Sequence, residues 1–293
     1  MREPDRRAFR TLVLLLAAAS LCAADPVPVP ATDTTLAQFL AAIHAKAKAL
    51  ETSAGMKEGF ASFTAHFKLQ AGAVSFSDYV TARLLFEATR DAGFWNLHWV
   101  ITDLPPNSDN IWRQWKTVRT PSPLVPTAIA ECDELSALYA FIAERAGIRS
   151  VGLFWPYPNH TVAVWTLNQP RGPVRIVVPT TQIFLDESDF WGTKKFDPWR
   201  QKVIYEYTRR DVPDTFEIPK PLFDFFLQQI DKYAGASDAT LQLLRYYREA
   251  VFSKNWTPAA AATETLKIRR GRSHSDPPEN LAALQSFAED MGR

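Results

Sequence analysis

The spacing of apolar residues along the first part of the chain predicts helices. In residues 36–50 and 56–67, apolar side chains recur every three or four positions, which is the spacing of one helix face. Residues 77–90 predict a third helix, which ends near Gly93. The apolar positions of the first two patterns are Leu36, Phe39, Leu40, Ile43, Ala47 and Leu50, and then Met56, Phe60, Phe63 and Phe67.

A further helical pattern begins at Cys132 and predicts a helix over residues 132–146. Acidic residues occupy its first turn, where negative charge is favourable next to the helix dipole. Gly147 follows the last turn, at the position where a glycine commonly ends a helix. The apolar stripe of this helix contains Cys132, Leu135, Tyr139, Ile142 and Ala146.

The pattern that follows this helix predicts an antiparallel sheet. Residues 148–155 are rich in strand-forming residues and end at a Pro-Tyr-Pro turn. From His160 onward the residues alternate between two faces, with Val162 and Val164 on the same face as the histidine. A loop at residues 168–173 leads into a return strand at residues 174–178. Further on, residues 203–207 predict a strand, and residues 222–230 and those after Ser237 predict helices.

The first 24 residues have the pattern of an export signal rather than of a folded element. Arg2, Arg6, Arg7 and Arg10 precede an apolar run, residues 12–24, that is too short to span a membrane. Small residues predict cleavage after Ala24. The pair at positions 6 and 7 fits a twin-arginine signal, and a Sec signal is the alternative. We therefore expect a periplasmic or extracellular protein with no transmembrane segment in its mature chain.

Cleavage there changes the charge and the cysteine content of the chain. It removes four of the 33 basic residues and two of the 32 acidic ones, which leaves a net charge of −1. Charge therefore gives no case for nucleic-acid binding. Cleavage also removes Cys22, so Cys132 becomes the single thiol and no intramolecular disulfide can form. The oligomeric state is left open.

The stretch from residue 130 to residue 182 resembles the transglutaminase-like superfamily, a branch of the papain-like thiol enzymes. In that family a cysteine starts a helix that ends near Gly-Ile, a histidine opens the next strand, and Asp-Pro-Thr closes the return strand. The matching positions here are Cys132, Gly147, Ile148, His160, Pro179 and Thr180. The resemblance implies an α+β fold with a papain/transglutaminase-like core, in which the helix bearing Cys132 packs on an antiparallel sheet bearing His160.

The predicted organisation has five parts. They are a signal peptide at residues 1–24, a Pro-rich tether at 25–34, a helical, Trp-rich region at 35–115, the core at 116–210 and a helical C-terminal region at 211–293. The Trp-rich region contains Trp95, Trp99, Trp112 and Trp115. These side chains either pack beneath a loop or form a wall of a substrate cleft.

Cys132 and His160 are the candidate catalytic residues. A helix N-terminus and a neighbouring imidazolium both lower the pKa of a thiol, and the thiolate is the nucleophile. It would attack an amide carbonyl and form a thioester, which water or an amine would resolve, while N–H groups at the helix start hold the oxyanion. We therefore expect a thiol hydrolase or acyltransferase that acts on a peptide or protein substrate. Taken singly, either residue also fits a buried core position.

No metal or cofactor is expected, because the other histidines lack metal-ligand spacing. These are His44, His66, His98 and His274.

The sequence departs from the family at Val178, which stands where the family has its catalytic aspartate. Valine can neither orient an imidazole nor stabilise its charge. In a regular strand Val178, Thr180 and Gln182 share one face, and a bulge or a one-residue slip would bring Thr181 instead. We take Thr180 as the third site residue, with Gln182 as the alternative. Without such a residue, the chain would be a catalytically inactive binding module of the cell envelope.

Overall fold

The fold is mixed α+β, as predicted, and the helix that begins at Cys132 packs against both the main sheet and neighbouring helices. The computed structural model describes residues 33–102, 107–181, 191–193, 196–207 and 212–236, together with Leu241, Leu244 and Arg248. The predicted signal peptide, most of the tether and the last forty-five residues lie outside this part of the chain. Within it, no helix is long and apolar enough to cross a membrane.

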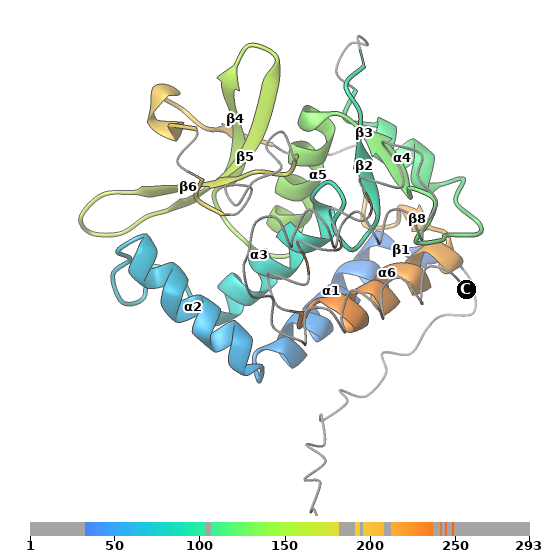
Figure 1. Ribbon diagram of the computed structural model, residues 1–293, viewed down its shortest axis with the longest axis horizontal. Coiled ribbons are helices and arrows are strands. Elements are labelled where there is room, and N and C mark those ends of the chain that lie inside the picture. The colour runs from blue at the N-terminus through green and yellow to red at the C-terminus, as the bar shows by residue number, and fades with distance from the viewer. Residues whose placement is uncertain are drawn as a thin grey trace, which may run out of the picture.

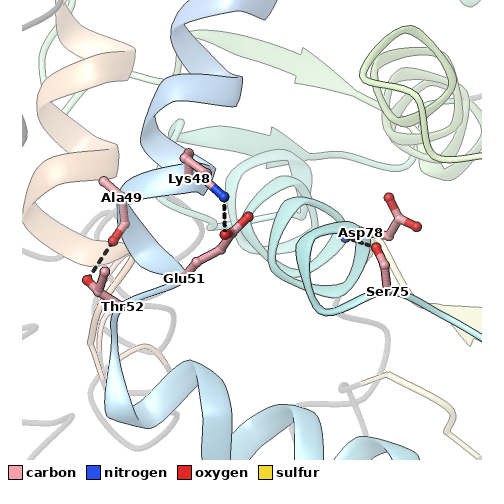
Figure 2. Close-up of polar contacts among 6 residues, drawn as sticks. All are labelled: Lys48, Ala49, Glu51, Thr52, Ser75 and Asp78. Carbon is pink, nitrogen blue, oxygen red and sulfur yellow. Dashed lines mark hydrogen bonds and ion pairs between the residues drawn. The ribbon is translucent and has the colours of Figure 1, made fainter. Parts of the chain in front are cut away.

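Three helices form the N-terminal region, as the periodicity predicts. They are α1 (Leu36–Leu50), α2 (Ala54–His66) and α3 (Phe76–Thr89). Ser75 caps α3 by accepting a hydrogen bond from the backbone N–H of Asp78 at 2.9 Å (Figure 2). At the end of α1, Lys48 pairs with Glu51 and the Thr52 hydroxyl donates to the carbonyl of Ala49 (Figure 2). These local bonds fix where the helices start and stop.

A parallel strand pair that the sequence did not predict joins the Trp-rich region to the segment before Cys132. Strand β2 (Leu97–Trp99) pairs with β3 (Ala128–Ala130), and the short helix α4 (Asn110–Trp115) lies between them in sequence. Trp95, Trp112 and Trp115 are buried in the main core, whereas Trp99 is only half-buried. Packing in the core therefore describes Trp95, Trp112 and Trp115, whereas only Trp99 is placed to line a cleft.

The main sheet is antiparallel and has the strand order β6-β5-β4-β7. Its strands are β4 (Val151–Tyr157), β5 (His160–Leu167), β6 (Val174–Val178) and β7 (Tyr205–Glu206). Strand β4 runs two residues beyond the predicted end at Trp155, because a bulge lets the chain continue through Pro156. A turn at residues 158 and 159 then reverses the chain directly into His160.

Helix α5 (Cys132–Arg145) packs on β4 and β5 with one side and contacts α3 and α4 with others. This position explains why every residue from Glu134 to Ala143 is buried. Helix α5 is thus held between the sheet and the other helices (Figure 1).

The first elements of the described chain contact elements near its end. Strand β1 (Thr34–Thr35) pairs with β8 (Glu217–Ile218), and α1 packs against α6 (Lys220–Tyr233). Figure 1 shows α1 and α6 side by side. The 3-10 helix η1 (Pro198–Arg200) contacts β4 and β6.

Candidate functional site

A cleft of about 850 Å³ lies at the N-terminal end of α5. Its lining comes from α5, β2, β4, β5 and β7, so segments far apart in the sequence meet here. Six side chains form what we call the aromatic wall: Trp99, Trp155, Tyr157, Phe196, Tyr205 and Tyr207. Cys132 and His160 both line the same cleft, as the sequence predicts.

Cys132 is the first residue of α5, and its sulfur lies against the backbone of β5. Thr161 donates its backbone N–H to Sγ at 3.5 Å, and the thiol donates to the carbonyl oxygen of Asn159 at 4.0 Å. One turn along α5, Ser136 donates its hydroxyl to the carbonyl of Thr161 at 3.1 Å. Two side chains of one helix face thus provide partners for the backbone of the strand, which is a structural role for both.

The thiol is surrounded by negative rather than positive charge. Burial raises the pKa of Cys132, and the charges of Asp133 and Glu131 raise it further, against the lowering effect of the Thr161 N–H. The helix dipole favours an anion at this end, but carboxylates already occupy it. The expectation of a depressed pKa is therefore wrong for this structure, and Cys132 is a protonated thiol at neutral pH.

His160 opens β5, as predicted, and its imidazole packs on the ring of Phe196 with 5.3 Å between the centroids. Burial lowers its pKa to about 4, so the imidazole is neutral at pH 7. Its Nε2 atom is buried and has no hydrogen-bond partner among the described residues. Within that part of the chain, the hydrogen bonds of the Cys132 thiol go to the backbone of Asn159 and Thr161, and none goes to His160. The two residues share a cleft without forming a thiolate–imidazolium pair.

Thr180, the predicted third site residue, bonds to α5. Its hydroxyl lies 2.7 Å from that of Ser136. Because the Ser136 proton goes to the carbonyl of Thr161, Thr180 must be the donor in this bond. The Thr180 hydroxyl therefore joins the segment after β6 to the helix, and no described hydrogen bond joins it to His160. Gln182, the alternative, lies outside the described residues.

Val178 does not stand beside His160. It is paired with Ala163 in the β5–β6 register and packs in the main core. His160 instead contacts Phe196, which belongs to a separate apolar cluster on the other face of the sheet. Continuing the register by three residues brings Thr181 opposite His160. The Thr181 hydroxyl is buried and has no hydrogen-bond partner among the described residues. Of the alternatives, Thr181 is the one that the register favours.

The chemistry of the cleft follows from these protonation states. It offers aromatic surface, two carboxylates, a neutral imidazole and a protonated thiol. Nucleophilic attack would first require proton transfer from Cys132 to His160, and burial disfavours both charged products. Among the described residues, no group of three or more His, Cys, Asp or Glu side chains could hold a metal ion.

Most of the aromatic wall was not predicted from the sequence. Trp155 and Tyr157 are two residues apart in β4, and Tyr205 and Tyr207 have the same spacing at the edge strand β7. Both pairs line the cleft, although a bulge interrupts β4 between Phe154 and Tyr157 and Tyr207 lies one residue beyond β7. Trp155 is 45% exposed and Tyr205 is 58% exposed, which is unusual for side chains of this size. Aromatic pairs at two-residue spacing are the sequence signal that could have located the cleft.

Comparisons with models of known families, with curated proteins and with solved structures found no match for this chain. The resemblance of residues 130–182 to the transglutaminase-like superfamily therefore depends on the residues themselves and on their arrangement.

Proposed function

We propose that this chain is an exported protein with a transglutaminase-like core, and that its aromatic cleft binds a ligand. In this proposal Cys132 and His160 are parts of the cleft lining rather than a nucleophile and its base. The packing of α5 on the β4–β5–β6 sheet, with the cysteine at the helix start and the histidine at the strand start, supports the proposed core.

The observation that carries the proposal is the aromatic wall around a neutral thiol that is bonded to the backbone. Trp155, Tyr157 and Tyr205 are each about half exposed at the mouth of the cleft. Exposed aromatic surface that lines a cavity of this size is typical of a ligand site. The thiol, in contrast, already has partners in Thr161 and Asn159, and its raised pKa disfavours the reactive form.

A thiol hydrolase or acyltransferase acting on peptide or amide bonds is the second candidate. One observation favours it: Nε2 of His160 is buried without a partner. A buried polar atom that lacks a hydrogen bond is costly and requires an explanation. A substrate that reoriented this imidazole toward Cys132 would complete a Cys–His pair.

Alkylation of Cys132 separates the two candidates. At pH 7, iodoacetamide should modify Cys132 about tenfold more slowly in the native protein than in the urea-unfolded chain, because the raised pKa reduces the thiolate fraction and burial limits access. His160→Ala should leave the native rate unchanged within about twofold, because no hydrogen bond links the two side chains. Mass spectrometry of the peptide that contains residue 132 gives the rate.

The control for this experiment is His44→Ala, which removes an imidazole from the exposed side of α1. Native alkylation that is faster than that of the unfolded chain, and is slowed by His160→Ala but not by the control, would establish the enzyme and exclude the binding module.

Export is the remaining part of the proposal. The apolar run and the small residues before Asp25 lead us to expect a mature protein that begins at Asp25. N-terminal sequencing of the protein from the cell envelope checks this, and a chain that still carries Met1 would contradict it. Replacement of Arg6 and Arg7 by lysines should block export only on the twin-arginine route.

A further inference from the structure

Among the residues that the structure describes, the charged side chains that line the cleft are all acidic. Glu131 and Asp133 contribute carboxylates, and the described lining contains no Lys or Arg. His160 does not offset this charge, because burial keeps its imidazole neutral. The cleft therefore combines a negative potential with the faces of the aromatic wall.

The two carboxylates differ in how their charge is satisfied. Glu131 accepts hydrogen bonds from both the backbone N–H and the hydroxyl of Thr102, on the segment that follows β2. Asp133 forms no ion pair with any described residue, and burial together with the charge of Glu131 raises its pKa. Two carboxylates are thus held close together in a partly dehydrated site, and none of the described Lys or Arg side chains pairs with Asp133. Such an arrangement favours binding of a positive charge.

The other groups of the cleft suit the same kind of ligand. Aromatic faces attract organic cations through the ring quadrupole, and they do so more strongly when the cation is desolvated. His160 is 6% exposed, and its Nε2 has no described partner, so this atom could accept a hydrogen bond from a ligand N–H in the tautomer that carries its proton on Nδ1.

We propose that the cleft recognises an organic cation, an alkylammonium or guanidinium group carried by its ligand, through the aromatic wall and the carboxylate of Asp133. This inference depends on the proposed binding function and specifies the chemical class of the ligand. Anionic and purely apolar ligands of the same shape should be bound less well, because neither compensates the two carboxylates.

Choline and its neutral carbon isostere 3,3-dimethylbutan-1-ol test the proposal, because they share a shape and differ in charge. In calorimetric titrations of the full chain, choline should bind about tenfold more tightly than the alcohol. Asp133→Asn should reduce this ratio to nearly one. Glu144→Gln, which removes the same charge from the exposed far end of α5, should leave the ratio unchanged. Added salt should weaken binding of choline but not of the alcohol.

The possible outcomes distinguish this inference from the function on which it depends. Equal affinities for choline and the alcohol in the unmodified protein would overturn the cation preference while leaving the binding cleft intact. A preference that survives Asp133→Asn would overturn the assigned role of that carboxylate. If neither compound binds, and neither slows alkylation of Cys132 at the cleft, the proposed binding function itself is wrong.

Discussion

Lowering the pH from 7 to 5 should destabilise the native protein by about 2 kcal/mol more than it destabilises a His160→Gln variant. The pKa of His160 is about 4 in the folded chain and 6.5 in the absence of structure. Between these values the unfolded state binds a proton that the folded state does not bind. Stability is therefore complete above about pH 6.5 and is lost as the pH falls toward 4. Urea unfolding at several pH values measures the difference.

The comparison with the variant isolates this one group. His98 also has a pKa lowered by burial, and Asp133 and Glu134 have raised pKa values, but the two proteins share these groups. His44→Gln, on the exposed side of α1, provides a control that should retain the full pH dependence. Parallel stability curves for the unmodified protein and His160→Gln would mean that the imidazole is charged or solvated in the fold. That result would restore the case for a catalytic histidine.

Gly152→Ala should displace β7 from the sheet and weaken ligand binding at the cleft by about tenfold or more. A Cβ at this position would lie 2.5 Å from the carbonyl oxygen of Tyr205 and 2.7 Å from Cγ2 of Ile204. The first of these atoms belongs to the backbone of β7, so the strand itself must move. Tyr205 and Tyr207 would then leave the aromatic wall. Overpacking of this kind costs about 1–3 kcal/mol, so the fold should survive.

The matched control for this change is Gly235→Ala, because a Cβ there would meet nothing within 4 Å. Choline titration and urea unfolding of both variants give the affinity and the stability. Unchanged choline affinity in Gly152→Ala would show that β7 is not part of the binding surface. A variant that does not fold at all would mean that this two-residue strand is needed for the stability of the whole sheet.

The elements that could be predicted are those whose signal is local. The stripe from Cys132 to Ala146 and the alternation from His160 onward each depend on neighbouring residues, and both elements lie where the sequence indicates. The pairing of β2 with β3 could not be predicted, because it joins residues 97–99 to residues 128–130 in strands of only three residues. The meeting of α1 with α6 is non-local for the same reason.

The sequence could bring the two candidate residues together, but it could not predict their electrostatic surroundings. Sequence order correctly places Cys132 and His160 at one cleft. The pKa of the thiol, however, depends on how deeply it is buried and on where the carboxylates of Glu131 and Asp133 point, and these are properties of the packed structure. The third site residue also could not be chosen from the sequence, because the choice depends on how the strands pack. Spacing alone favours Thr180, whereas the strand register turns its hydroxyl toward Ser136.

The packing of α1 against α6 determines when the chain can complete its core during synthesis. Phe39 of α1 packs against Phe223 and Phe226 of α6, and Lys220, the first residue of α6, follows the end of α1 at Leu50 by 170 residues. A ribosome that adds about 5–20 residues per second needs roughly 10–30 s to cover that distance. During this interval α1 can contact α3 but not its later partner. Trp95, which also packs on Phe39, is synthesised early, but the part of the α1 surface that α6 covers stays uncovered on the nascent chain throughout this interval.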